Sequence, residues 1–201
     1  MPRPNAPLLR PALALAVVLA LAGCTTPDAG PDATEPPAAS GTAAPTDTAA
    51  PTPEPTEEPL PFEAACADLI TLDQMYEFNP NFGDAPGYEP ESDAVSAVAE
   101  ARGTVCGWSN QTSGDLIELG VATLPDNAYA AQVGRAAVDS TAVPTYGTPP
   151  DVEGFFSQSG GLGRAQVFAG GYWIVLESRE FFEPGDAEQL VSAVRANLAG
   201  R

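Results

Sequence analysis

Histidine and lysine are both absent from this chain of 201 residues, so most catalytic constellations cannot be built from it. Histidine is the usual general base and transition-metal ligand, and lysine forms Schiff bases and binds phosphates. Ser-His-Asp, Cys-His, zinc-hydrolase and Walker-type sites are therefore excluded. The 27 Asp and Glu residues leave carboxylate chemistry, such as a glycosidase pair, but no two of them stand out from a solvated surface. We expect no enzymatic activity, no cofactor and no metal site.

The cysteines are the most distinctive reactive side chains, and Cys24 stands at the end of an export signal. Arg3 and Arg10 give the N-terminus a positive charge, and an uninterrupted apolar run over 12–22 follows. At about 1.5 Å per residue this run is too short for a bilayer core of about 30 Å. The sequence therefore predicts a secretory signal peptide over 1–23 and not a spanning helix.

The residues Leu21-Ala22-Gly23-Cys24 resemble the lipobox of bacterial lipoproteins. The resemblance implies cleavage before Cys24 and a diacylglycerol thioether on its sulfur, with fatty acids such as palmitate. Two or more acyl chains hold a protein firmly to a bilayer. The mature chain would then be anchored to the cell membrane on its extracytoplasmic face. The alternative is ordinary cleavage that leaves Cys24 as a free thiol.

Residues 24–59 have the composition of a tether. After Cys24 they are mostly Pro, Thr, Ala, Asp and Glu, with no aromatic residue. Such a segment buries too little apolar surface to offset its loss of conformational entropy, so we expect a disordered linker. The net charge of the whole chain, −19 at pH 7, repels nucleic acid and anionic headgroups, and nucleic acid is therefore excluded as a partner.

Residues 60–201 are long enough for one folded domain, and their pattern predicts the α+β class. Apolar spacing predicts helices over 62–76, 93–102, 126–138 and 186–198. Alternation predicts strands over 104–109, 116–123, 152–157, 164–168 and 172–178. The turn-rich segment 110–115 and Gly170-Gly171 predict hairpin connections. We therefore expect a single antiparallel sheet of about five strands with helices packed on it.

Cys66 and Cys106 are the two cysteines that remain if Cys24 carries lipid. In an oxidising compartment we expect them to form a disulfide, which would close a loop of about 40 residues. The alternative, a redox-active pair, usually needs closer spacing.

The segments Cys66-Ala67-Asp68-Leu69-Ile70 and Cys106-Gly107-Trp108 resemble a family of actinobacterial cell-envelope lipoproteins. Those proteins share an export signal, a Pro/Thr tether, an early cysteine and a later Cys-x-Trp motif. The similarity covers most of 60–198 in layout. It implies a PsbP-like α/β/α sandwich, and it transfers no catalytic residue.

Aromatic side chains gather next to Cys106 and in the last third of the chain. We expect Trp108 to pack over the disulfide, with stacking on a ligand as the alternative. Strand alternation makes Phe156 and Tyr172 candidates for an open sheet face, and Trp173 follows Tyr172. The candidate patch for a ligand or partner is therefore Trp108, Phe156, Tyr172 and Trp173.

Two loops imitate known ion sites. Four carboxylates lie within 84–93, but they lack the spacing of a calcium loop, which favours a solvated acidic loop. Ser159-Gly160-Gly161-Leu162-Gly163 imitates part of a phosphate-binding loop, but it precedes a strand, which favours a mobile turn.

Two functional classes follow from these observations. The first is a tethered binding module that presents its domain to an envelope protein or to an apolar or small ligand. The second is a structural or accessory subunit of a membrane complex, with no ligand of its own. A deep apolar cavity would favour the first class, and a flat exposed apolar patch without a cavity would favour the second.

Overall fold

The computed structural model describes residues 57–201 of the chain. The expected signal peptide, the lipobox with Cys24 and the tether up to residue 56 lie outside the described residues. None of the helices within 57–201 is both long and apolar enough to cross a bilayer.

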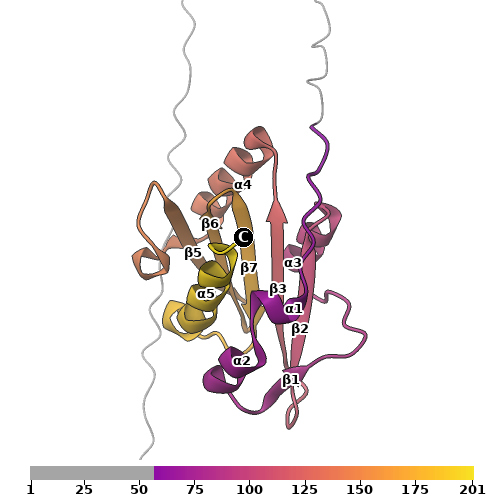
Figure 1. Cartoon of the computed structure of the whole chain (residues 1–201). Helices are drawn as coiled ribbons and strands as arrows, with labels where there is room; N and C mark the ends of the chain where they lie inside the picture. Colours follow the sequence, from indigo (N-terminus) through magenta and orange to yellow (C-terminus); the bar gives the residue numbers. More distant parts are fainter. Residues whose placement is uncertain (1–56) are drawn as a thin grey trace, which may run out of the picture. The chain divides into compact units, whose positions relative to one another are not determined.

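One antiparallel sheet of seven strands forms the centre of the described part (Figure 1). The strand order is β1-β2-β3-β7-β6-β5-β4. The strands are β1 Phe82–Asp84, β2 Thr104–Asn110, β3 Leu116–Thr123, β4 Thr141–Ala142, β5 Val152–Ser159, β6 Leu162–Ala169 and β7 Tyr172–Ser178. The α+β class and the antiparallel sheet are thus confirmed, and all five predicted strands are present within one or two residues of their expected ends.

The expected number of strands was too low, because the sheet has two additional edge strands. β1 has three residues and β4 has two, and each pairs with one neighbour only. Strands this short show no alternating pattern, since their place depends on backbone pairing with a neighbour that is distant in sequence.

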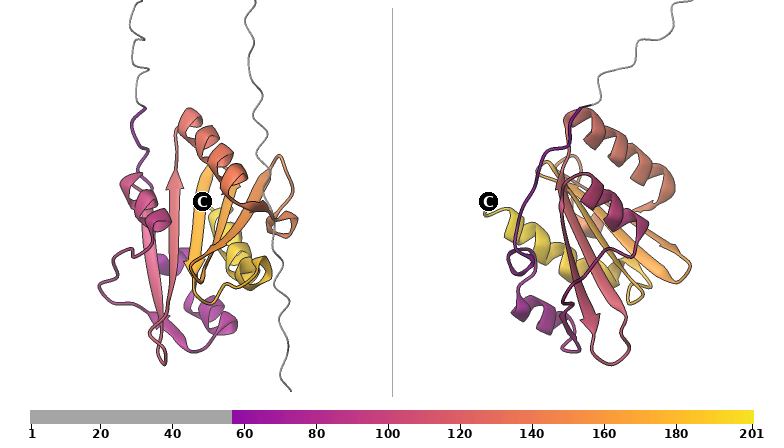
Figure 2. Two further views of the ribbon diagram at one scale, coloured as in Figure 1. Left: turned by 180° about the vertical axis from the view of Figure 1, so that it is seen from behind. Right: turned by 90° about the vertical axis from the view of Figure 1, so that its right-hand side faces the viewer.

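Helices cover both faces of the sheet, as the two views in Figure 2 show. On one face lie α1 Cys66–Leu69, α2 Leu72–Phe78 and α5 Pro184–Leu198, together with the short 3-10 helix η1 Pro144–Tyr146. On the other face lie α3 Asp93–Glu100 and α4 Asp126–Asp139. Each face has its own apolar core, and the two cores share the central strands. Alternate residues of β3 and β7 point into opposite cores, so these strands are apolar almost throughout.

The helix predicted over 62–76 is wrong, because the structure divides this segment into two short helices. Thr71 caps α2: its hydroxyl accepts a hydrogen bond from the Gln74 amide, and the Gln74 side chain accepts one from the Thr71 amide. This capping box starts a new helix and ends the preceding one at Leu69. Phe62 and Ala64, which precede α1, lie beside the start of β2 and are hydrogen-bonded to Arg102 and Thr104.

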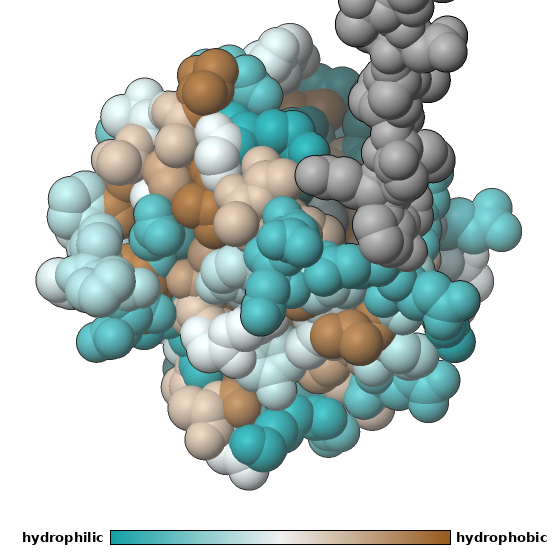
Figure 3. Space-filling view, turned by 90° about the horizontal axis from the view of Figure 1, so that it is seen from above, coloured by the Kyte–Doolittle hydropathy of each residue, from teal (hydrophilic) through white to brown (hydrophobic). Residues whose placement is uncertain are grey.

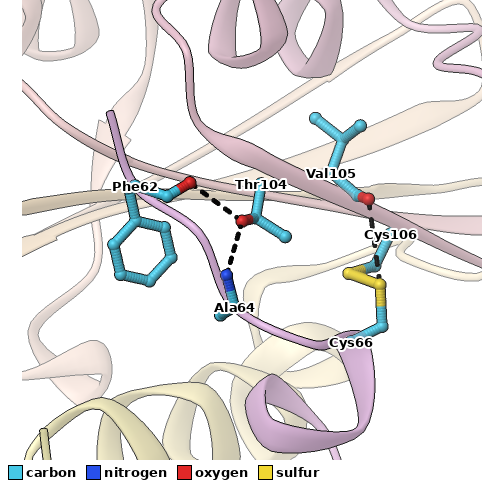
Figure 4. Close-up of a disulfide and its surroundings, with 6 residues drawn as sticks. All are labelled: Phe62, Ala64, Cys66, Thr104, Val105 and Cys106. Carbon is cyan, nitrogen blue, oxygen red and sulfur yellow. Dashed lines mark hydrogen bonds between the residues drawn. A yellow bond between two sulfur atoms is a disulfide. The ribbon is translucent and has the colours of Figure 1, made fainter. Parts of the chain in front are cut away.

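The disulfide between Cys66 and Cys106 is confirmed, with an S–S distance of 2.02 Å and a sequence separation of 40 (Figure 4). It joins the start of α1 to β2. Thr104, two residues before Cys106, holds the same segment: its hydroxyl donates to the Phe62 carbonyl and accepts from the Ala64 amide, both at 3.0 Å. The chain that enters the domain is therefore attached to β2 by one covalent bond and a pair of hydrogen bonds.

Both glycine pairs form hairpin turns. Gly160-Gly161 joins β5 to β6, and Gly170-Gly171 joins β6 to β7. All four residues have positive φ angles, which glycine adopts without steric strain and which two-residue hairpin turns require.

Candidate ligand-binding site

A pocket of about 490 Å³ lies between the last turns of α5 and the end of the sheet where β7 begins. We call it the α5–sheet pocket. Its volume falls within the range of small-molecule sites, about 300–1,000 Å³. Its lining residues are Asp151, Val152, Ala169, Gly170, Tyr172, Ile174, Ser192, Arg195, Ala196, Leu198 and Ala199.

The register of three strands builds the floor of this pocket. Val152 of β5 pairs with Ala169 of β6, which pairs in turn with Tyr172 of β7. Residues that are directly opposite in neighbouring strands project from the same face, here the face that α5 covers. Ile174, two residues after Tyr172, projects from that face as well.

Small side chains leave the space open. Ala169 lies in the middle of the three-strand row, and the pocket is lined on its other side by Ala196 of α5 and by Ala199, the residue that follows α5. Figure 3 views the molecule from above, towards the end of the sheet where β3 ends and β7 begins. On the part of this face that residues 57–201 form, apolar residues are interspersed with hydrophilic ones.

Arg195 is the cationic residue of the pocket lining. Its Nη1 donates to the Tyr146 carbonyl at 2.5 Å, which ties η1 to α5. Its Nε is buried and has no hydrogen-bond partner among residues 57–201. No carboxylate within that range lies at ion-pair distance from Arg195, since the ion pairs there are formed by Arg164 and Arg201. The pocket thus combines an apolar surface with an unneutralised guanidinium.

A polar row crosses the opposite face of the sheet. Register places Gly107, Glu118, Glu177, Arg164 and Ser157 side by side on β2, β3, β7, β6 and β5. Both carboxylates of the row are buried, with 5 % of Glu118 and 2 % of Glu177 exposed. Arg164 Nε donates to Glu177 Oε2 at 2.5 Å. A buried carboxylate needs such partners, because an unpaired one would be strongly destabilising.

Tyr88 covers the other end of the row. Its ring lies directly over Gly107, where an added Cβ would be 2.3 Å from the ring. Its hydroxyl donates to Glu118 Oε1 at 2.6 Å, and the Glu91 and Ser92 amides donate to the same oxygen. Burial, and then the hydrogen bond to Glu118 and the charge of that residue, raise the pKa of Tyr88 well above its usual range.

A second pocket of about 280 Å³ opens at the Arg164 end of the polar row. The carboxylates that line it are Glu91, Asp93 and Glu177, whereas Glu118 does not line it. Glu118 Oε1 instead accepts from the Tyr88 hydroxyl and from the Glu91 and Ser92 amides, and these bonds hold the loop before α3 on the sheet.

The structure separates the four aromatic residues that the sequence proposed as a patch. Trp108 and Phe156 are buried on the α5 face, Trp108 in the same core as Cys106. Trp173 is buried on the opposite face, where its Nε1 donates to Gln166. Tyr172 alone lies at a pocket, packed edge-on against Phe62 with ring centroids 5.4 Å apart. In the described part, residues 57–201, helices cover both faces of the sheet, so these side chains do not share the open sheet face that was expected.

Two residues of the acidic loop over 84–93 have structural roles at its ends. Asp84 ends β1, and Ser92 caps α3 by accepting from the Val95 amide. Within residues 57–201, no group of three or more Cys, Asp or Glu side chains is arranged to hold a metal ion.

The sequence analysis did not single out Glu118 and Glu177 of the polar row or Arg195 of the α5–sheet pocket. Glu118 and Glu177 each interrupt an apolar strand, and such an interruption is a signal of a buried, partnered acid. Arg195 gives no such signal, since an arginine on an amphipathic helix is ordinarily a surface residue.

Comparisons of the chain with protein-family models, with curated proteins and with solved structures give no match.

Proposed function

We propose that this chain is a lipid-anchored extracytoplasmic binding protein whose domain holds a small, largely apolar ligand in the α5–sheet pocket, without catalysis. The anchor is Cys24, and the residues up to 59 act as the tether. The ligand would be an apolar compound of the cell envelope that enters the pocket beside α5.

The observation that carries this proposal is the pocket itself. An apolar hollow of about 490 Å³ is the feature expected of a binding module, whereas an accessory subunit needs only an exposed surface. Small side chains at Ala169, Ala196 and Ala199 leave room for such a ligand between α5 and the sheet.

The family resemblance supports the same picture at a coarser level. Helices on both faces of the sheet agree with an α/β/α sandwich. The PsbP-like arrangement within that class stays a proposal, since no solved structure matches.

Blocking the pocket tests the proposal. In the full chain with Cys24→Ser, which keeps attached acyl chains out of the assay, we would titrate the neutral apolar dye N-phenyl-1-naphthylamine and follow its fluorescence. Ala196→Phe should weaken dye binding at least tenfold, because the exposed Ala196 lines the hollow. Ala137→Phe on α4 is the matched control, since Ala137 is exposed on a helix of the opposite face.

Equal dye affinity in the two variants would contradict the pocket as the site. No saturable binding to the parent chain would contradict the proposed function. In that case, chemical crosslinking of the lipidated chain in its native membrane would test the accessory-subunit alternative.

A further inference from the structure

The free edge of Arg195 is the starting observation. A guanidinium carries Nε and Nη2 on one edge, and this edge binds a carboxylate with two parallel hydrogen bonds. Nη1 lies outside that edge, and in this protein Nη1 is the atom that donates to the Tyr146 carbonyl. The structural contact of Arg195 therefore leaves its carboxylate-binding edge unused.

The unused edge is also unsatisfied. Nε is buried and has no partner within residues 57–201, and among those residues it is the only buried side-chain nitrogen or oxygen in that condition. A buried donor without a partner is destabilising, and such groups in native proteins usually mark a site completed by water, an ion or a ligand. Nε is closed to solvent in this structure, so binding of a ligand there requires the guanidinium to turn towards the pocket.

The surroundings select the charge of the ligand. Arg195 offers one positive charge, while Asp151 stands at the rim and the chain as a whole carries −19. The guanidinium neutralises a single negative charge, and the net charge of the chain disfavours a phosphate with two charges more strongly than a carboxylate with one. A planar carboxylate also fits the edge better than a tetrahedral anion does in a two-bond arrangement.

We infer that the ligand of the α5–sheet pocket is an amphipathic monocarboxylate, such as a fatty acid. Arg195 binds its carboxylate, and Tyr172, Ile174 and Leu198 contact its hydrocarbon part. This inference rests on the proposed function and adds the chemical class of the ligand to it.

A matched pair of ligands tests the inference. Decanoate and 1-decanol have the same chain length and differ in the head group alone. We would measure their binding to the full chain with Cys24→Ser by isothermal titration calorimetry. Decanoate should bind about tenfold tighter or more, a factor that corresponds to about 1.4 kcal/mol and is within reach of hydrogen bonds to a charged group.

Arg195→Met should remove this preference: decanoate affinity falls about tenfold, and decanol affinity changes less than about twofold. Because this variant also loses the bond to Tyr146, a second variant leaves Arg195 intact. Ser192 is exposed, lines the pocket and stands one helical turn before Arg195. Ser192→Asp should weaken decanoate and spare decanol, and Ser192→Asn is the neutral control of similar size.

The outcomes separate the two proposals. Equal binding of decanoate and decanol to the parent chain would overturn the carboxylate inference and leave the apolar binding site standing. A preference for decanoate that survives both Arg195→Met and Ser192→Asp would overturn the role of Arg195. Failure of both compounds and of the neutral dye would overturn the proposed function together with the inference.

Discussion

Removing the Cys66–Cys106 disulfide should lower the free energy of unfolding by about 4 kcal/mol. The bond spans 40 residues, and in the chain-entropy model a loop of this size restricts the unfolded chain by roughly that amount at 25 °C. The perturbation is Cys66→Ala with Cys106→Ala in the full chain carrying Cys24→Ser. Native contacts contribute less, because an alanine at the buried Cys106 position leaves only the small space of one sulfur.

Equilibrium unfolding in urea measures this change. Far-ultraviolet circular dichroism and the fluorescence of the buried Trp108 and Trp173 should give the same midpoint if unfolding is two-state. The denaturant slope should rise, because the unfolded chain without its crosslink exposes more surface. For a folded part of this size, a loss of about 4 kcal/mol corresponds to a melting temperature lower by about 8–16 °C.

Thr104→Val provides the control. It removes the two hydrogen bonds that hold Phe62 and Ala64 but keeps the crosslink, so its cost should be about 1–3 kcal/mol. A loss below about 1 kcal/mol for the cysteine double variant, with an unchanged denaturant slope, would refute the reasoning that the bond acts by restricting the unfolded chain.

Two further predictions concern packing and ionisation. Gly163→Ala should lower the free energy of unfolding by about 1–3 kcal/mol, because the added Cβ would be 1.9 Å from the Phe181 carbonyl oxygen. Gly185→Ala in α5 is the control: no atom lies within 4 Å of its added Cβ, so it should be neutral or slightly stabilising in the same urea assay. Similar losses for both would contradict the close approach of Phe181 to β6. Since the pKa of Tyr88 is raised on folding, the folded state keeps this proton longer than the unfolded state, so stability is complete below about pH 10 and falls as the pH rises further. Tyr88→Phe keeps the ring over Gly107, removes this ionisation and should make the urea midpoint fall less steeply as the pH rises above about 10; an equally steep fall would contradict it.

The order of the longer elements follows from the sequence alone. β3 and β7 have the predicted ends, and α4 and α5 differ from their expected ranges by one or two residues. These segments show strong apolar periodicity, and glycine pairs or a proline mark their boundaries. The disulfide was also predictable, because it depends on counting cysteines and on the compartment and not on geometry.

At Thr71 a local capping signal overrides the apolar spacing from which helices were predicted. Apolar spacing alone predicted one helix over 62–76, but the capping box of Thr71 and Gln74 starts a second helix there. The capping box is visible in the sequence as Thr-x-x-Gln, but the apolar spacing that continues across it favoured one uninterrupted helix. The edge strands β1 and β4 had no comparable signal, since backbone pairing with distant partners defines them.

The position of Glu118 beside Glu177 depends on tertiary structure. Glu118 and Glu177 are 59 positions apart in the chain, and only the register of β3 with β7 makes them neighbours. Either residue could be recognised as an unusual acid in an apolar strand, but its partner could not be named. The aromatic residues show the same limit, because alternation does not reveal that a second layer of helices covers the other face.

The sequence by itself determined the cysteine pairing and most of the strand and helix order, because these depend on composition and on contacts close in the chain. The export signal stays a prediction, since it lies outside residues 57–201. Tertiary structure decided the pocket. Val152, Ala169 and Tyr172 become one floor only through the pairing of β5, β6 and β7, and Arg195 meets that floor only because α5 packs across it. A hollow exists where small side chains from separate elements meet, and no single segment of the sequence contains that information.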